Sequence, residues 1–341
     1  MAGLGFIPPM EAKLVSDLPS DGGWQFEPKW DGFRCMAVKD GETTELWGKS
    51  GKPLGRYFPE IVALVRGMPE AQLVLDGELM IAIDGAASFD ALQQRLHPAE
   101  SRVRKLAVET PALLVLFDLL RQDDTDWSNR PLVERRAALE AFVKAAPKDT
   151  GLRLSPATRD VAIAERWYSG LSHELDGVIA KPLAEPYAAG ERAMLKVKRI
   201  RSADCVVGGF RYGTGSKEVG SLLLGLFNAE GKLDHVGFTS GLVAGEKPAL
   251  TKKLEGLVGG PGFTGKSPGG PSRWSTERSA EWEPLRHELV VEVLYDQITG
   301  DRFRHGTRIK RWRPDKAVHQ CTFAQLAPAV EPDAVIRGIV T

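Results

Sequence analysis

The sequence has few cysteines and no long apolar segment. Its 341 residues include three cysteines, Cys35, Cys205 and Cys321, which lie far apart and form no CxxC pair. This spacing excludes a disulfide framework and a cysteine-based zinc site, and it is typical of a reducing cytoplasm. No apolar run approaches the roughly 20 residues that cross a bilayer, and the N-terminus lacks a signal-peptide pattern. We therefore expect a cytoplasmic protein with no membrane partner.

The chain also lacks a net charge, because 45 lysines and arginines balance 45 aspartates and glutamates. A polyanionic partner must therefore be held by local basic patches rather than by the overall charge. The hydrophobic fraction of 43% and the charged fraction of 26% are ordinary for a soluble globular protein. At about 100 to 200 residues per domain, the length predicts two domains.

One stretch near the N-terminus, EPKWDGFR at residues 27–34, places a lysine beside a turn signal. The Asp31-Gly32 pair before an apolar run indicates first of all a β-hairpin with Lys29 at its mouth. A lysine can instead act as a nucleophile, but only its neutral form attacks. At neutral pH the neutral fraction is under about one in a thousand. Burial, neighbouring cations or a metal must then favour the neutral amine.

Alternating apolar segments predict strands and helices through the first 200 residues. We expect strands over 22–26, 33–39, 43–47, 73–81, 113–120, 174–181 and 193–198, and helices over 58–65, 88–96, 131–143 and 161–171. Asp76 and Glu78 lie on one face of a strand, so they either reach solvent or meet a ligand, because charged side chains are seldom buried unless paired. Phe117, taken alone, is typical of a core residue. Lys196 and Lys198 share one strand face, as on a solvated edge strand.

The pattern changes after residues 199–202, which indicates a domain joint. Short strands near 205–212, 221–227, 233–238 and 289–294, one helix near 248–258 and glycine-rich turns predict a small closed barrel such as an OB-fold. Residues 213–217 predict a hairpin turn, because their spacing fits neither a P-loop nor a dinucleotide-binding fingerprint. Residues 301–316 are dense in arginine and lysine, as on solvated faces and on tracks for backbone phosphates.

Taken together and in this order, six segments resemble the motifs of covalent nucleotidyltransferases, and most closely those of the ATP-dependent DNA ligases. The resemblance extends from about residue 24 to 316 and is specific, because all six motifs recur with suitable gaps. The little space before Trp24 makes the minimal two-domain bacterial C-type ligases the nearest match. The segments are Lys29-Trp30-Asp31-Gly32 with Arg34, Asp76-Gly77-Glu78, Phe117-Asp118, Glu174-Leu175-Asp176-Gly177-Val178, Lys196-Val197-Lys198 and Arg313-Pro314-Asp315-Lys316.

The resemblance implies a fold and a reaction. The fold is α+β, with an adenylation (nucleotidyltransferase) domain of antiparallel sheets and flanking helices over residues 1–200 and an OB-fold domain over 201–341. In the reaction, Lys29 attacks the α-phosphate of ATP and forms a lysyl-AMP phosphoramidate. The adenylate then passes to the 5′-phosphate of nicked duplex DNA, and the 3′-hydroxyl displaces AMP to seal the nick. The expected setting is DNA repair by a monomer, with other DNA-repair proteins as further candidate partners.

The resemblance also implies how the nucleoside is held. Glu27 reads the adenine amine, Phe117 stacks on the adenine ring, and Arg34 and Glu78 hold the sugar. The chain departs from the family pattern at one place, because Gly48-Lys49-Ser50-Gly51 stands where many such ligases have Ser-Arg-Asn-Gly. Lys49 keeps the positive charge for a phosphate contact but lacks the two-pronged fork of arginine.

The phosphates and the metal are assigned in the same way. Lys196 and Lys198 contact the α-phosphate, and their charges are expected to lower the pKa of Lys29. Glu174, together with Asp31, is expected to hold Mg²⁺ or Mn²⁺, since these ions prefer oxygen ligands.

The last motif lies in the second predicted domain. Arg313, Asp315 and Lys316 are expected to orient the pyrophosphate of ATP. Because they are far from Lys29 in sequence, the barrel must close over the nucleotide for the first step and reopen to hold DNA.

Two other functions remain open on the sequence. An RNA ligase or a capping guanylyltransferase shares Lys-x-Asp-Gly, although the Arg-x-Asp-Lys motif after a barrel disfavours the RNA ligases that lack a barrel. A preference for ATP or GTP separates a DNA ligase from a capping enzyme. A non-catalytic nucleic-acid-binding scaffold is disfavoured by the intact acids and lysines of all six motifs.

Overall fold

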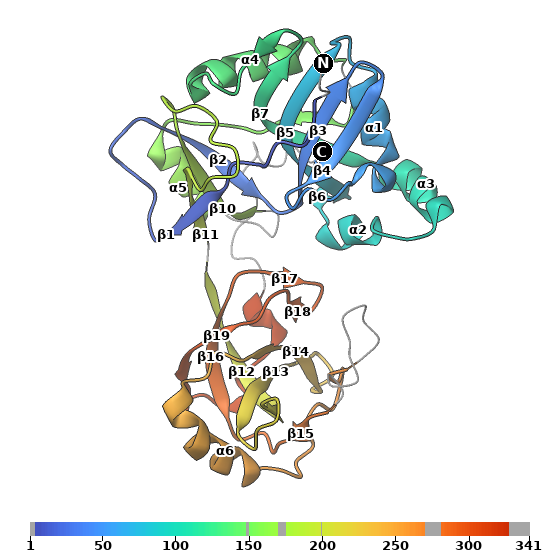
Figure 1. Cartoon of the computed structure of the whole chain (residues 1–341). Coiled ribbons are helices and arrows are strands. Elements are labelled where there is room, and N and C mark those ends of the chain that lie inside the picture. The colour runs from blue at the N-terminus through green and yellow to red at the C-terminus, as the bar shows by residue number, and fades with distance from the viewer. Residues whose placement is uncertain (1–3, 148–149, 170–174, 199, 270–280, 327–341) are drawn as a thin grey trace. The chain divides into compact units, whose positions relative to one another are not determined.

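The computed structural model describes residues 4–147, 150–169, 175–198, 200–269 and 281–326 (Figure 1). The chain divides into two compact units, with the boundary in the sequence between residues 199 and 200. None of the helices in the described ranges is long and apolar enough to cross a membrane. Each unit is described separately below.

Two β-sheets form the centre of the first unit (Figure 1). The larger sheet has the order β4 (Thr43–Gly48), β3 (Phe33–Asp40), β5 (Gln72–Ile83), β7 (Ala112–Gln122) and β8 (Thr125–Asp126), with β6 (Ala86–Ala87) beside β5 and β9 (Leu152–Leu154) beside β7. The smaller sheet has the order β1 (Ala12–Val15), β11 (Met194–Lys198), β10 (Leu175–Pro182) and β2 (Trp24–Trp30). Its pairings are antiparallel except between β1 and β11.

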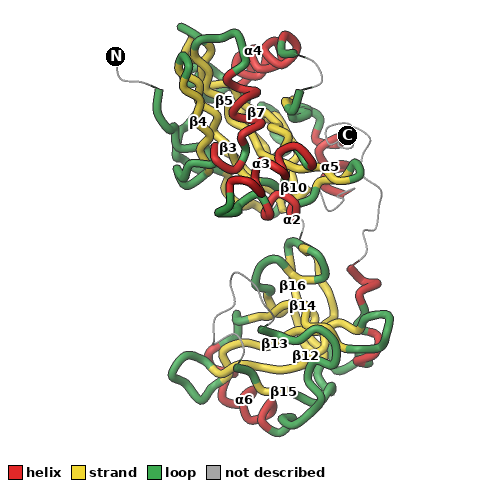
Figure 2. The backbone as a smooth tube through the Cα atoms, turned by 90° about the vertical axis from the view of Figure 1, so that its right-hand side faces the viewer, coloured by secondary structure: helices red, strands yellow, loops and turns green. Residues whose placement is uncertain are grey.

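Helices flank these sheets, as the red segments around the yellow strands in Figure 2 show. Pro59 occupies the first turn of α1, where its missing N–H costs no hydrogen bond. Ser88 caps α2 by accepting a hydrogen bond from the Ala91 backbone N–H. Both features confirm helix starts that the sequence predicted. The helices are α1 (Pro59–Arg66), α2 (Phe89–Gln94), α3 (Glu100–Glu109), α4 (Leu132–Ala145) and α5 (Val161–Ser169).

The two faces of the larger sheet bury different partners. One face packs against α1 and α4, through residues such as Ile61 and Leu139. The other face meets the smaller sheet, where Trp30 and Val178 pack with Met80 of β5. Because apolar side chains fill the space between the sheets, the position of β2 is fixed relative to β3 and β5.

The predicted hairpin at Asp31-Gly32 is wrong. β2 pairs with β10 in the smaller sheet, whereas β3 pairs with β4 and β5 in the larger sheet. Asp31-Gly32 therefore carries the chain from one sheet to the other, and Lys29 lies at the end of β2 beside this crossing. A Cβ at Gly32 would lie 2.2 Å from the Leu79 carbonyl oxygen, so this close approach requires glycine. The strands predicted over 33–39 and 43–47 do form a hairpin, because β3 pairs with β4 across the turn at Gly41.

The second unit is built around one antiparallel sheet. Thr239 of β14 forms a bridge with Thr307, the residue before β19, and donates its hydroxyl to the Thr307 carbonyl over 2.9 Å. Since β14 and β19 are the two outer strands, these bonds close the sheet into a barrel. The mainly antiparallel sheets with flanking helices of the chain confirm the predicted α+β class. The sheet order is β14 (Leu233–Thr239), β13 (Val219–Phe227), β12 (Arg201–Tyr212), β16 (Val290–Tyr295) and β19 (Arg308–Trp312), with β15 (Glu283–Pro284) beside β12, a separate ribbon of β17 (Ile298–Thr299) and β18 (Arg302–Phe303), and one helix, α6 (Lys247–Glu255).

A buried ion pair in the first unit provides a test of stability. Arg135 of α4 contacts Asp118 of β7 through two bonds of 2.8 and 3.0 Å, and each side chain is 1% exposed. Arg135→Met keeps apolar volume but leaves Asp118 charged and unpaired. We expect the free energy of unfolding, measured by urea denaturation, to fall by about 3–5 kcal/mol.

The matched control is Arg104→Met in α3. Arg104 pairs with Glu100, but the two side chains are 75% and 71% exposed. Its loss should cost under about 1 kcal/mol. Equal losses in the two variants would show that burial does not govern the contribution of the Arg135 pair.

Candidate active site

A cavity of about 790 Å³ opens in the first unit where both sheets contribute residues. Its volume lies within the range of about 300–1,000 Å³ that is usual for ligand pockets. Strands of both sheets, the segment Pro9–Ala12 and the loop after β4 line it. Eight of the residues predicted to bind or react with the nucleotide meet here: Glu27, Lys29, Arg34, Lys49, Glu78, Phe117, Lys196 and Lys198.

A carboxylate that the sequence analysis gave no role lies against the predicted nucleophile. Asp176 Oδ2 is 2.6 Å from Lys29 Nζ and 2.9 Å from Lys198 Nζ. The Asp176 side chain is 5% exposed, and its Oδ1 has no hydrogen-bond partner among the described residues. One buried carboxylate thus contacts two lysines. Lys29 therefore has an anion beside it, in addition to the cations that the sequence predicted.

The strand pairing explains this arrangement. Gly177 of β10 pairs with Lys29 on one side and with Lys198 on the other. The register shifts between Leu175 and Gly177, so Asp176 is the extra residue of a β-bulge. Bulges turn a side chain away from the regular alternation of the strand. Gly177 adopts a φ of 150° and a Cβ there would lie 1.9 Å from the Val197 carbonyl oxygen, so the site requires glycine.

Lys196 completes the cationic side of the cavity. Burial, and then the charges of Lys29 and Lys198, lower its pKa below the ordinary lysine value. The three amines of Lys29, Lys196 and Lys198, with Lys49 and Lys52 also in the lining, favour a ligand that carries several negative charges.

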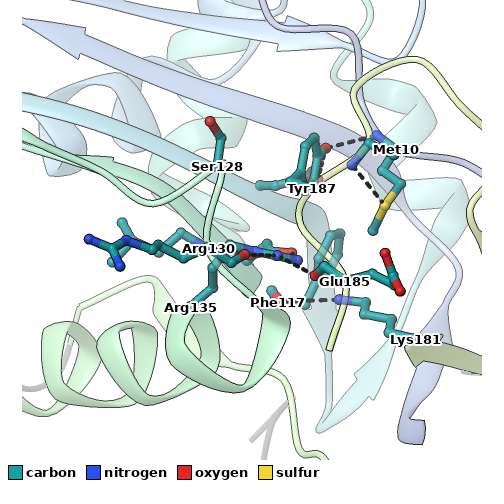
Figure 3. Close-up of polar contacts among 12 residues, drawn as sticks. Met10, Phe117, Ser128, Arg130, Arg135, Lys181, Glu185 and Tyr187 are labelled. Atoms are coloured by element: carbon teal, nitrogen blue, oxygen red, sulfur yellow. Dashed lines mark hydrogen bonds and ion pairs between the residues drawn. The ribbon is translucent and has the colours of Figure 1, made fainter. Parts of the chain in front are cut away.

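A second group of residues lies around Glu27 and Phe117. Glu27 is buried, accepting a hydrogen bond from the Gln25 side chain over 2.8 Å and pairing with Lys181 Nζ over 2.9 Å. Lys181 also donates to the Phe117 carbonyl oxygen and lies 4.7 Å from the centre of its ring (Figure 3). The register of β5 and β7 shifts next to Phe117. The sequence analysis did not identify Lys181 as a site residue. Its place in the sequence, near the end of β10, gives no indication that it pairs with Glu27 of β2.

Arg34 and Asp76 form a buried pair at the edge of the cavity. Two bonds of 2.6 Å join the Arg34 guanidinium to the Asp76 carboxylate, which is 0% exposed. Asp76 therefore neither reaches solvent nor lines the cavity. The expectation that it would reach solvent or meet a ligand was wrong, because its charge is paired with Arg34. The Arg34 guanidinium also lies 4.5 Å from the centre of the Phe117 ring.

Glu78 and Lys49 border the cavity in different environments. Burial raises the pKa of Glu78 to about 7, against the opposing charges of Arg34 and Lys29. Its Oε1 accepts a hydrogen bond from the Gly32 backbone N–H over 3.2 Å. Lys49 is 61% exposed and pairs with Glu11 over 3.2 Å, a single contact without the fork of an arginine.

Five predicted residues remain, two from the sequence of the first unit and three from the second unit. Asp31 is described but is not part of its lining, and Glu174 lies outside the described residues. The second unit holds Arg313, Asp315 and Lys316. There Arg313 contacts Asp315 and a carboxylate of β12, Asp204, which also lies 3.6 Å from Lys316 Nζ.

Comparisons with known proteins cover both units. The family described as ATP dependent DNA ligase domain matches residues 9–198, and the ATP dependent DNA ligase C terminal region matches residues 215–316. DNA ligase C of Mycobacterium tuberculosis is 44% identical over 336 residues, which cover 94% of this chain and 93% of that protein. DNA ligase C2 of Mycolicibacterium smegmatis is 43% identical and covers 94% of each chain. A solved Lig E DNA ligase has the same fold, with a TM-score of 0.57 and 17% identity over 90% of this chain and 100% of that one.

Glu78 gives a test based on pH. The Glu78 pKa is 4.5 in the unfolded chain and about 7 in the folded chain. Between pH 4.5 and 7 the folded chain therefore retains a proton that the unfolded chain has lost. The stabilisation linked to this proton is complete below about pH 4.5 and disappears as the pH rises through about 7. Glu78→Gln removes this loss. The difference between the two pKa values corresponds to about 3 kcal/mol, so the stability of the variant relative to wild type should increase by about that amount between about pH 4.5 and 8 in urea denaturation.

The exposed turn residue Glu42, replaced by glutamine, is the control for this measurement. The difference in unfolding free energy between Glu42→Gln and wild type should stay constant over the same pH range. A Glu78→Gln difference that is equally constant would contradict the assigned pKa.

Proposed function

The chain belongs to the ATP-dependent DNA ligase family, and from this premise we propose that it seals nicks in duplex DNA through a lysyl-AMP intermediate on Lys29. The observation that carries the proposal is the cavity in which Lys29, Lys196 and Lys198 converge with a buried carboxylate. A nucleophilic amine and cations for phosphate oxygens are the groups that the first step needs. RNA ligation and mRNA capping receive no support from the relatives, which are named as DNA ligases.

In the first step the Lys29 nitrogen forms a bond to the α-phosphorus of ATP, and the bond to the pyrophosphate oxygen breaks. Lys196 and Lys198 face the phosphate oxygens and stabilise the charge that develops on them. The Lys29 ammonium must first lose a proton. Asp176 Oδ2, at 2.6 Å, is placed to hold that proton and to orient the amine.

A divalent cation fits beside Asp176. The carboxylate is buried, and its Oδ1 is without a hydrogen-bond partner among the described residues, so one hard oxygen is available. We assign Mg²⁺ or Mn²⁺ to Asp176, with Glu174 and Asp31 as the further ligands expected from the sequence. Once bound, the ion supplies positive charge to the phosphates and weakens the attraction of Asp176 for the Lys29 ammonium.

The nucleoside part of ATP is assigned to the other side of the cavity. Glu27 reads the adenine amine, and Phe117 packs against the adenine ring. Arg34 and Glu78 hold the sugar, and Lys49 is a further cation for phosphate. Each of these residues lines the cavity, and the Lys181 ammonium holds the Glu27 carboxylate in place through their ion pair.

The later steps involve the second unit. Arg313, Asp315 and Lys316 orient the pyrophosphate when the barrel, which we assign to residues 201–341, closes over the adenylation domain of residues 1–200. The barrel then reopens, and its basic residues hold nicked duplex DNA. We further propose a monomer that acts in the cytoplasm in DNA repair, alongside other repair proteins.

The covalent intermediate is the most direct test. Purified protein incubated with ATP and Mg²⁺ should gain the mass of one AMP, and peptide mapping should place an acid-labile adduct on Lys29. The same protein should seal a labelled nicked duplex. Lys29→Ala should lose both properties completely, because no other group supplies the nucleophile.

Lys144→Ala, which removes an exposed lysine of α4, is the matched control and should retain both. An AMP adduct on another residue, or nick sealing by Lys29→Ala, would refute the proposal.

The role of the second unit is tested with Lys316→Ala. We expect self-adenylation to slow by about 10- to 100-fold, the effect of losing a charged contact to phosphate, while sealing of a pre-adenylated nick survives. Lys232→Ala, in an exposed pair with Glu230 of the same unit, should leave both steps unchanged. Equal loss of both steps in Lys316→Ala would count against closure of the barrel in the first step.

A further inference from the structure

We propose that Tyr187 is a positioning residue, which fixes Arg34 at the nucleotide cavity through the buried carboxylate of Asp76. Tyr187 lies in the segment after β10, does not line the cavity and was not among the predicted site residues. The inference rests on the proposed function, because it assumes that Arg34 holds the sugar of ATP.

Hydrogen bonds link the four groups into a closed ring. The Tyr187 hydroxyl donates to Asp76 Oδ2 over 2.6 Å, and the same oxygen accepts from Arg34 Nη2 over 2.6 Å. The Tyr187 hydroxyl also accepts from the Met10 backbone N–H over 2.8 Å. Arg34 Nη2 completes the ring by donating to the Met10 carbonyl oxygen over 3.3 Å. A shift of any member therefore disturbs the others.

Burial makes each of these bonds consequential. Asp76 is 0% exposed, Met10 is 4% exposed and Tyr187 is 7% exposed. Water cannot easily replace a lost partner at such positions, and an unsatisfied buried polar group is destabilising. Without the Tyr187 hydroxyl, the Met10 N–H loses its partner and Asp76 is held by Arg34 alone.

Tyr187 is itself held rigidly, as a positioning residue must be. Its backbone N–H donates to the Ser128 carbonyl oxygen over 2.9 Å, and its ring lies 5.7 Å from the Arg135 guanidinium. Arg135 also donates to the carbonyl oxygens of Arg130 and Glu185. Figure 3 shows these residues around the segment that leads to Tyr187. The start of α4 thus fixes the tyrosine, and the tyrosine fixes the carboxylate.

Arg34 is the member of the ring that needs this support. Its side chain is 21% exposed and lines the cavity, while its Nε and Nη2 bond to Asp76. A long arginine side chain loses several rotamers when it is held in one position. A carboxylate whose plane is set by Tyr187 restrains Nε and Nη2 of Arg34 at once, which sets the plane of the whole guanidinium and leaves Nη1 for a ligand in the cavity.

The test is Tyr187→Phe, which removes one hydroxyl and keeps the ring. In self-adenylation with labelled ATP, the apparent KM for ATP should rise about three- to tenfold, as expected for the loss of one or two hydrogen bonds, with a smaller change in the maximal rate. Tyr212→Phe is the matched control, because that hydroxyl contacts Glu255 on the surface of the second unit. It should leave the KM unchanged.

A double-mutant cycle separates positioning from a general structural effect. In the Arg34→Lys background the two-pronged contact with Asp76 is already lost, so adding Tyr187→Phe should change the KM by less than twofold. An equal KM increase in both backgrounds, or an unchanged KM in Tyr187→Phe, would overturn the inference. Should Tyr187→Phe not fold, Asp76→Asn tests the same link and must also raise the KM.

The same experiment distinguishes the two levels of the proposal. A wild-type protein that never becomes labelled refutes the proposed function, and the assignment of Tyr187 is refuted with it. A labelled wild type beside a Tyr187→Phe variant with the same KM refutes the Tyr187 assignment alone.

Discussion

The contact between the Asp176 carboxylate and the amines of Lys29 and Lys198 is the interaction on which the site depends. Three strands meet there, because β10 lies between β2 and β11 and carries the carboxylate on a bulge. A carboxylate in this place keeps two like charges close together in a partly buried cavity, where they would otherwise repel each other. The contact therefore holds the Lys29 amine in a fixed position beside Lys198.

The rest of the first unit supports this contact from a distance. The apolar layer between the sheets, with Trp30 and Met80, fixes β2 against β5. The crossing at Asp31-Gly32 brings Lys29 from one sheet to within reach of side chains from the other. The Asp118–Arg135 pair joins β7 to α4, and Tyr187 holds Asp76, the partner of Arg34. Packing, buried ion pairs and hydrogen bonds thus set the geometry before a nucleotide enters.

Much of this was predictable from the sequence. The periodicity predicted most of the longer strands and helices, although it missed α3 (Glu100–Glu109). The resemblance to the ligases identified eight residues that do line one cavity. What failed depends on pairing between distant segments. Asp31-Gly32 has the composition of a hairpin, but the partner of β2 is β10, and local turn preference contains no information about it. The sequence could not show that Asp176, as well as Glu174, has a place in the site. The β-bulge that directs the Asp176 side chain forms only when β10 pairs with β2. Tyr187 and Asp76 are 111 residues apart and share no pattern that links them.

The bridge between Thr239 and Thr307 has a consequence for behaviour in solution. An open sheet offers a row of free backbone donors and acceptors to any neighbouring molecule, and growth of such contacts leads to aggregates. In the second unit these groups are satisfied at the seam by the chain itself. Several copies of the barrel can therefore lie close together on a long polyanion. At the seam their strands cannot pair with one another, because the backbone groups there are already bonded within the chain.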